Sequence, residues 1–134
     1  MKKLLVSDKV YVSSSKIINA GRGVYAKRNI KKGEIIETCP IILVSKYDTS
    51  KLEESILVTY FFYTGKKKEE LAVALGFGSI YNHSYRPNAK YKINRTKKLL
   101  EFTALRNIKK DEEITFNYKQ GNTKNNVPLW FEAV

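Results

Sequence analysis

The sequence predicts a mainly β fold with one inserted helix. Short runs of β-branched and aromatic residues fill the first 45 residues and are separated by Gly33 and Pro40, as in a series of short strands. Residues of about 48–65 carry apolar side chains at helical spacing. Residues 89–104 alternate apolar and polar side chains on either side of a polar turn. Together these patterns indicate small sheets and a single helix.

The N-terminal half of the chain is expected to form short strands. Their side chains are largely Val, Ile and Tyr, which fit a half-buried pleated surface. The strands are predicted at residues 10–12, 23–26, 34–38 and 41–45.

The helical insert is predicted over about 48–65. Ser50 and Glu53 have the spacing of a capping box, in which each side chain bonds a free backbone N–H at the start of a helix. Apolar residues follow at intervals of three and four, and the helix should end before Gly65. These apolar residues are Ile56, Leu57, Tyr60, Phe61 and Tyr63.

A β-hairpin is predicted downstream. Ala89, Tyr91 and Ile93 alternate with polar residues, and so do Leu100, Phe102 and Ala104. Residues 95–98 form the polar turn between the two runs.

One segment of the chain is nearly repeated. Residues 26–35 recur almost residue for residue as residues 104–114. Two similar corners between strands are implied, in which an isoleucine packs inward and Lys-Lys-Gly or Lys-Lys-Asp turns at the surface. This structural explanation suffices, so we assign the repeat no catalytic role.

Length and composition point to one domain over residues 1–134. A chain of this length with 43% hydrophobic residues can bury one core. No apolar stretch reaches the roughly 20 residues that span a bilayer, which predicts a soluble intracellular protein of the cytoplasm, nucleoid or nucleus. With one Cys and one His, the chain is not expected to hold a disulfide or a structural zinc ion.

The charge is strongly positive. Twenty-five Lys and Arg residues against thirteen Asp and Glu residues give a formal net charge of +12. Such a surface can attract nucleic acid or an acidic protein. A merely solvated basic surface is an equally simple interpretation, because most of the lysine pairs fall in expected turns.

Four segments in a fixed order resemble the SET-domain lysine methyltransferases, especially their compact viral and bacterial members. The resemblance extends from about residue 10 to residue 118. It implies a β-clip-like fold of small sheets, with a C-terminal pseudoknot that brings Asn82 and His83 beside Tyr118. The segments are Gly21-Arg22-Gly23-Val24-Tyr25-Ala26, Ala74-Leu75-Gly76-Phe77-Gly78-Ser79-Ile80-Tyr81-Asn82-His83-Ser84, Pro87-Asn88 and Glu113-Ile114-Thr115-Phe116-Asn117-Tyr118.

The resemblance also implies a site for S-adenosylmethionine. Taken alone, a Gly-x-Gly pair is more often a turn, and a solitary histidine is more often structural. In the SET family the loop matching Gly21, Arg22 and Gly23 contacts the amino-acid end of the cofactor. Asn82 and His83 match residues that hold the cofactor, and His83 is expected to be neutral and hydrogen-bonded rather than a general base.

Tyr118 is the expected catalytic residue. A free lysine has a pKa of roughly 10.4, so the site must favour its neutral amine, and a dry aromatic channel does so by desolvation. Tyr60 is the expected second tyrosine of this channel. Phe77 and Tyr81 are further candidates, although ordinary core packing explains these two at least as well. No metal is required for this chemistry.

The C-terminal residues 119–134 depart from the commoner family pattern. A polar linker over 119–126 precedes an aromatic tail in which Trp130 is a candidate to cover the adenine of the cofactor. Asn117 stands where Asp is commoner before the tyrosine, which keeps a hydrogen-bonding shape but removes a charge.

The predicted function is methyl transfer from S-adenosylmethionine to a lysine of a histone tail or another nucleic-acid-associated protein. The alternative is a non-catalytic basic SET-like module that binds nucleic acid or an acidic protein. Phosphate binding would weaken steeply with salt, whereas cofactor binding would not. Resemblance to dimeric relatives also suggests a homodimer. A basic substrate would further require acidic residues near the groove, and the candidates are Asp48, Glu53, Glu54, Glu69 and Glu70.

Overall fold

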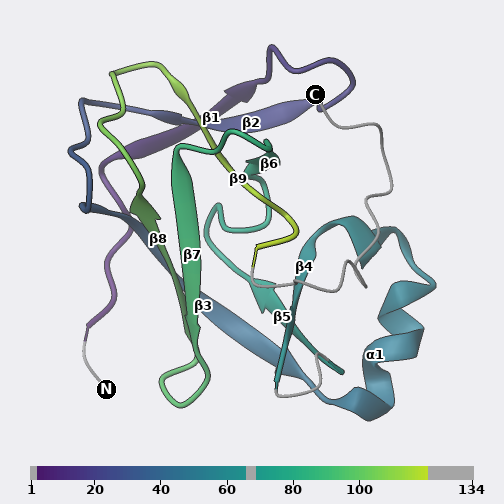
Figure 1. Ribbon diagram of the computed structural model, residues 1–134. Helices are drawn as coiled ribbons and strands as arrows, with labels where there is room; N and C mark the ends of the chain where they lie inside the picture. Colours follow the sequence, from purple (N-terminus) through teal and green to yellow (C-terminus); the bar gives the residue numbers. More distant parts are fainter. Residues whose placement is uncertain (1–2, 66–68, 121–134) are drawn as a thin grey trace.

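Two small curled sheets make up most of the protein. The computed structural model describes residues 3–65 and 69–120, and within them lie nine strands, one α-helix and one 3-10 helix (Figure 1). None of the helices in this part of the chain has the length and apolar character needed to cross a membrane. The mainly β fold predicted from the sequence is confirmed.

The first sheet has the strand order β1-β2-β9-β6. Strands β1 and β2 form an antiparallel hairpin, and β2 also pairs antiparallel with β9. The short strand β6 runs parallel to β9, with Asn82 opposite Thr115 and His83 opposite Phe116. The bounds are β1 Val10–Ser14, β2 Arg22–Ala26, β6 Asn82–His83 and β9 Glu113–Phe116.

The second sheet has the order β4-β5-β3-β8-β7 and is antiparallel throughout. The hairpin predicted from the alternation over residues 89–104 is confirmed as β7 and β8. The bounds are β3 Ile35–Val44, β4 Phe61–Thr64, β5 Glu70–Ala74, β7 Ala89–Asn94 and β8 Leu99–Ala104.

The prediction of two separate strands on either side of Pro40 is wrong, because β3 runs through the proline. Proline has no N–H to donate, which normally interrupts a sheet. Here Pro40 lies at the end of the pairing with β5, and its carbonyl accepts a hydrogen bond from the Leu75 N–H at 2.9 Å. A residue other than proline at position 40 would donate its N–H to the Leu75 carbonyl. That carbonyl accepts from the Gly78 N–H at 3.2 Å, so both backbone groups of Leu75 have a hydrogen-bond partner.

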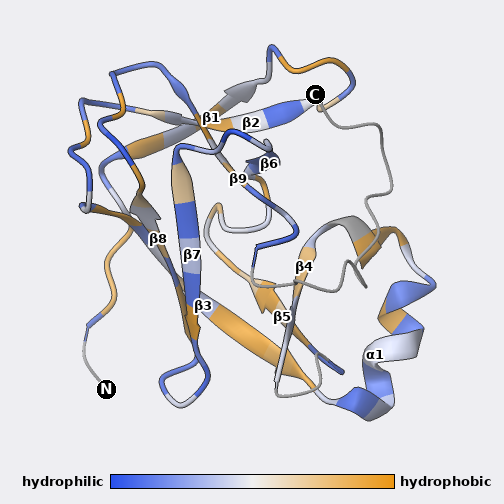
Figure 2. Ribbon diagram, in the orientation of Figure 1, coloured by the Kyte–Doolittle hydropathy of each residue, from blue (hydrophilic) through white to orange (hydrophobic). Residues whose placement is uncertain are grey.

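The predicted helix over about 48–65 is also wrong in extent. Helix α1 spans Lys46–Glu53, the 3-10 helix η1 spans Ile56–Thr59, and the remaining apolar residues form strand β4. Ser45, not Ser50, is the N-cap residue of α1, and the Ser55 side chain accepts a hydrogen bond from the Leu57 N–H at the start of η1. Figure 2 shows α1 as largely hydrophilic, so little apolar packing holds a longer helix together.

Strand β4 forms because its side chains alternate between the core and the outer face. Phe62 and Thr64 are buried, whereas Phe61 and Tyr63 are only half-buried. Phe62 packs on Phe116 of the first sheet with ring centroids 5.5 Å apart. Aromatic residues at period two fit a strand beside β5 better than a helix at the surface.

The core joins the two sheets. Its largest fully buried side chains include Tyr81 and Phe102, whose rings stack with centroids 4.0 Å apart. Phe102 of β8 also contacts Phe116 of β9 at 5.4 Å. Figure 2 shows the accompanying concentration of apolar residues on β3 and β5.

The two copies of the repeated segment pair with each other around a local two-fold axis. Ile30 and Ile108 donate to each other's carbonyl at 2.8 Å, and both side chains are 1% exposed. The side chains of Asn29 and Asn107 reach across to accept from the N–H groups of Lys110 and Lys32, both at 2.9 Å. The predicted inward isoleucines are confirmed, and the repeat builds one paired structure rather than two separate corners.

Candidate functional site

The parallel pair of β6 and β9 brings together the two most distinctive sequence segments. Because His83 lies opposite Phe116, the chain that follows β9 passes directly beside β6. The Ser84 N–H donates to the Phe116 carbonyl at 3.0 Å and extends this contact. Tyr118 is thereby placed against Asn82 and His83, as the predicted C-terminal pseudoknot requires.

Tyr118 is held at both its backbone and its side chain. Its N–H donates to His83 Nδ1 at 3.0 Å, and its hydroxyl donates to the Tyr81 carbonyl at 2.8 Å. Burial, with smaller contributions from Tyr60 and Glu113, raises the pKa of Tyr118 well above its ordinary value. The phenol therefore stays protonated at neutral pH and acts as a hydrogen-bond donor.

His83 is buried and neutral. Its side chain is 3% exposed, and its ring packs edge-to-face against Tyr85 and Tyr118 with centroids 4.5 and 5.2 Å away. Burial and the nearby Lys119 charge lower the pKa of His83 below its ordinary 6.5. Since Nδ1 already accepts from the Tyr118 N–H, His83 positions the C-terminal segment and is not placed to collect a proton there.

The Gly21-Arg22-Gly23 segment lies against Asn82 through β2 and the loop before it. Asn82 Nδ2 donates both to the Arg22 carbonyl and to Glu113 Oε2, each at 2.8 Å. A Cβ atom on Gly23 would overlap the Glu113 carboxylate, so only glycine permits this close approach. The predicted loop residues and Asn82 thus belong to one hydrogen-bonded group.

Glu113 is the residue at this site to which we assigned no role from the sequence. Its carboxylate accepts from the Ser15 hydroxyl at 2.7 Å as well as from Asn82. Glu113 lies inside the Glu113-to-Tyr118 segment, which is the signal that could have indicated it. Its partners come from the β1–β2 loop and from β6, and no spacing in the sequence places them together.

Asn88 is the second residue without a predicted role. Its side chain is 2% exposed and bonds the backbone of β9 at two points. Oδ1 accepts from the Thr115 N–H at 2.9 Å, and Nδ2 donates to the Glu113 carbonyl at 2.8 Å. This single side chain fixes the strand that leads to Tyr118.

The three predicted channel residues lie in different surroundings. Tyr60 follows η1, is 39% exposed and lies near enough to raise the pKa of Tyr118 electrostatically. Phe77 is half-buried against the core. Tyr81 is 1% exposed, with its ring on Phe102, and its hydroxyl donates to Glu37 Oε1 at 2.7 Å. Its backbone carbonyl accepts the hydrogen bond from the Tyr118 hydroxyl. Trp130, predicted to cover the adenine, lies outside the described residues.

Cys39 is not an activated nucleophile. Its thiol is fully buried, and burial together with the neighbouring Glu37 carboxylate raises its pKa. A thiol with a raised pKa stays protonated, and the protonated form is the unreactive one. Covalent cysteine catalysis is therefore excluded for the described part of the chain.

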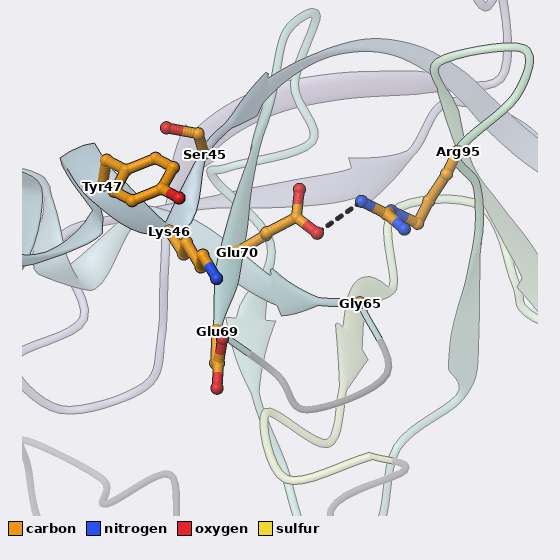
Figure 3. A pocket seen from close by; sticks show the side chains of 7 residues that line it. All are labelled: Ser45, Lys46, Tyr47, Gly65, Glu69, Glu70 and Arg95. Atoms are coloured by element: carbon orange, nitrogen blue, oxygen red, sulfur yellow. Dashed lines mark hydrogen bonds and ion pairs between the residues drawn. The ribbon is translucent and has the colours of Figure 1, made fainter.

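A cavity of about 540 Å³ opens away from these residues, between the start of α1, the ends of β4 and β5, and the β7–β8 turn (Figure 3). It mixes charges, since Glu70 pairs with Arg95 at 2.6 Å and Lys46 lies near Glu69 on its wall. None of the predicted site residues lines it. The acidic residues expected near a substrate groove are thus partly neutralised here, and we assign this cavity no role. Its lining residues are Ser45, Lys46, Tyr47, Gly65, Glu69, Glu70 and Arg95.

Comparison with known proteins identifies relatives of this arrangement. A family model described as the SET domain matches residues 21–119. A histone-lysine N-methyltransferase of Schizosaccharomyces pombe, specific for lysine 37 of H3, is 30% identical over 112 residues, which cover 84% of this chain and 71% of the relative.

Solved structures share the fold. A candidate histone methyltransferase of Plasmodium falciparum superposes with a TM-score of 0.62 and 34% identity, over 82% of this chain and 96% of that one. A chain of the Chaetomium thermophilum Polycomb Repressive Complex 2, in an autoinhibited conformation bound to S-adenosylmethionine, gives a TM-score of 0.72 and 26% identity. The match covers 92% of this chain but only 16% of that one.

Proposed function

Since this chain belongs to the SET-domain family and is a protein-lysine methyltransferase, we propose that it transfers a methyl group from S-adenosylmethionine to the ε-amine of a lysine in a protein substrate. The observation that supports this most is the placement of Tyr118. Its hydroxyl, bonded to the Tyr81 carbonyl at 2.8 Å, lies beside the strand that carries Asn82 and His83.

The chemistry of the site suits this cofactor. The groups gathered around Asn82 and Tyr118 are oxygen acceptors and aromatic faces: the Glu113 carboxylate, the Tyr81 carbonyl and the ring of His83. Such groups favour a ligand that carries positive charge. When bound, S-adenosylmethionine supplies an electrophilic methyl group on a positively charged sulfonium. Gly21, Arg22, Gly23, Asn82 and His83 would hold it, and Trp130 would cover its adenine.

Glu113 positions Asn82 for this task. Asn82 Nδ2 is committed to the Arg22 carbonyl and the Glu113 carboxylate, which fixes the orientation of the amide group. The amide oxygen then faces away from Glu113 as an acceptor for the cofactor. Ser15 holds the carboxylate from its other side at 2.7 Å.

The lysine amine is made neutral by its surroundings and not by a base. Tyr118 remains protonated because its pKa is raised, and His83 uses Nδ1 for the Tyr118 N–H. The amine therefore loses its proton to water before it enters a channel walled by Tyr60 and Phe77. There desolvation keeps it neutral, and the Tyr118 hydroxyl with the Tyr81 carbonyl aims its lone pair.

The substrate is a basic protein tail. Three of the similar proteins are described as histone methyltransferases or belong to a Polycomb complex, which supports a histone tail or another nucleic-acid-associated protein as the target. We also propose that the enzyme forms a homodimer, as its resemblance to dimeric relatives suggests, and sedimentation that shows only monomer at micromolar concentration would remove this part of the proposal.

Labelled methyl transfer tests the function. The parent protein, Tyr118→Phe and the control Tyr47→Phe are incubated with methyl-labelled S-adenosylmethionine and a protein extract. Tyr118→Phe keeps the ring but removes a positioned hydroxyl, so labelling should fall by roughly 100-fold or more. Tyr47 is 79% exposed and far from the site, so its variant should label as the parent does. Equal labelling by all three proteins contradicts the assignment.

A further inference from the structure

The repeated segments create a concentrated positive surface. Residues 26–34 and 104–112 hold seven Lys or Arg residues against three acidic residues. Far apart in sequence, these segments are joined through the two hydrogen bonds between Ile30 and Ile108. Both corners appear together at the upper left of Figure 1, away from β6 and the end of β9. We call the exposed residues Lys31, Lys32, Lys109 and Lys110, with Arg28 and Arg106, the corner surface.

Two of the three acidic groups in these corners are paired with cations, and the third, Asp111, accepts from the Tyr11 hydroxyl at 2.8 Å. Glu34 accepts from the Lys31 N–H at 2.9 Å and pairs with Lys9 and Arg28. Its counterpart Glu112 accepts from the Lys109 N–H at 3.1 Å and pairs with Arg106 at 2.9 Å.

The four lysines of the corner surface form no ion pair with any described residue, and all four are exposed. Their charges therefore remain available to a partner.

Side-chain hydrogen bonds fix the backbone that carries these lysines. The Asn29 and Asn107 side chains hold the opposite corner by accepting from the Lys110 and Lys32 N–H groups at 2.9 Å. Each pair of lysines therefore sits beside the Arg-Asn of the other copy. The isoleucines beneath are buried, so apart from the 38%-exposed Leu105 the corners offer charge and not an apolar anchor.

We propose that the corner surface docks this enzyme on the phosphate backbone of double-stranded DNA. Protein interfaces usually centre on buried aromatic or aliphatic anchors, which the corners lack, whereas backbone recognition of DNA needs only positioned cations. Docking would hold the site close to proteins that are themselves bound to DNA.

Salt-dependent binding of a mixed-sequence duplex tests the proposal. The full chain is compared with a variant in which Lys31, Lys32, Lys109 and Lys110 are all changed to Gln. A control variant changes the exposed Lys90, Lys92, Lys97 and Lys98 to Gln and so removes the same total charge. Fluorescence anisotropy gives the dissociation constant of each protein for the duplex. The salt concentration is varied from about 50 to about 200 mM, over which phosphate contacts change the affinity strongly.

The corner variant should lose most of the salt dependence. Four lost phosphate contacts reduce the slope of log K against log salt by about 3 to 4, and binding at the lowest salt should weaken at least about tenfold. The control variant should change the slope by less than about 1. Equal losses in the two variants would show that diffuse charge is responsible and would overturn the proposal.

Two further arms identify the partner. A single strand of the same sequence should bind more weakly than the duplex, and polyglutamate of the same charge should bind more weakly still. Equal binding of either one overturns the assignment to duplex DNA. Methyl transfer to a free lysine peptide should be the same for the corner variant and the parent, which separates this proposal from the catalytic one and shows that the variant is folded.

Discussion

At the scale of single residues, the protonation states of Tyr118 and His83 define what the site can do. Burial raises the pKa of Tyr118 above its ordinary 10.0 and lowers that of His83 below its ordinary 6.5. Between these two values both residues are neutral. Over this interval the neutral fraction of the substrate lysine rises with pH, because the pKa of free lysine is roughly 10.4.

The pH dependence of the rate follows from these two shifts. Values of kcat/KM measured with a lysine peptide should rise about tenfold per pH unit between roughly pH 7 and 9, because the fraction of neutral amine rises in that way. Loss of the Tyr118 proton should lower the rate only above its raised pKa, beyond pH 10.0. A falling limb centred below that value would contradict the assignment of Tyr118. An inflection below the ordinary histidine value of 6.5 that His83→Asn removes would make His83 a base.

Some residues of the site could be predicted from the sequence and others could not. Tyr118, Asn82 and His83 lie in segments whose order resembles a known family. Glu113 and Asn88 lie in the same segments, yet their roles depend on hydrogen bonds to Ser15, Asn82 and the backbone of β9. Those partners come together only when β9 is in place, so no local pattern specifies them.

At the scale of elements, strand β9 carries the site and Asn88 secures it. Asn88→Ala would leave the Thr115 N–H and the Glu113 carbonyl without their partner. A lost partner for a buried backbone group costs about 1–3 kcal/mol, so the free energy of unfolding should fall by about 2–4 kcal/mol. Urea unfolding measures this change.

Asn94 offers a matched control for that experiment. It is exposed, and its side chain accepts from the Lys97 N–H at 3.0 Å in the β7–β8 turn. Asn94→Ala should cost less than about 1 kcal/mol. If Asn88→Ala costs no more than Asn94→Ala, the attachment of β9 depends on other contacts.

The elements that could be predicted are those with one unambiguous period. The β7–β8 hairpin alternates strictly around a polar turn, and its position is confirmed. The prediction of one long helix was wrong because Phe61 and Tyr63 satisfy a helical spacing, whereas Phe62, between them, is the residue that packs on the core. The prediction of a strand break at Pro40 was wrong for another reason. The Gly78 N–H bonds the Leu75 carbonyl in place of the N–H that proline lacks, and the sequence alone does not place Gly78 nearby.

At the scale of the whole molecule, the two sheets share one core. Tyr81 stacks on Phe102 of β8, and Phe116 of β9 packs on Phe62 of β4. These contacts favour the prediction that residues 1–134 form a single domain. The repeat adds a further tie, because the Ile30–Ile108 pairing links the β2–β3 corner to the β8–β9 corner.

A single cooperative unfolding transition is the expected consequence. Far-ultraviolet circular dichroism reports the sheets, and near-ultraviolet dichroism reports the packing of the nine tyrosines. The two signals should change at the same urea concentration, as in two-state unfolding. Transitions at clearly different concentrations would show that the sheets unfold separately and would refute the single-domain prediction.

The measurement that tests the central claim most directly is steady-state methylation of a defined lysine peptide, with mass spectrometry of the product and calorimetry of S-adenosylmethionine binding. The Tyr118 hydroxyl, held by the Tyr81 carbonyl at 2.8 Å, should matter for transfer and not for cofactor affinity. Tyr118→Phe should therefore lower kcat by roughly 100-fold or more while the cofactor Kd stays within about threefold of the parent. A methylated lysine formed at the parental rate by Tyr118→Phe, or no methylated lysine formed by the parent protein, would contradict the account.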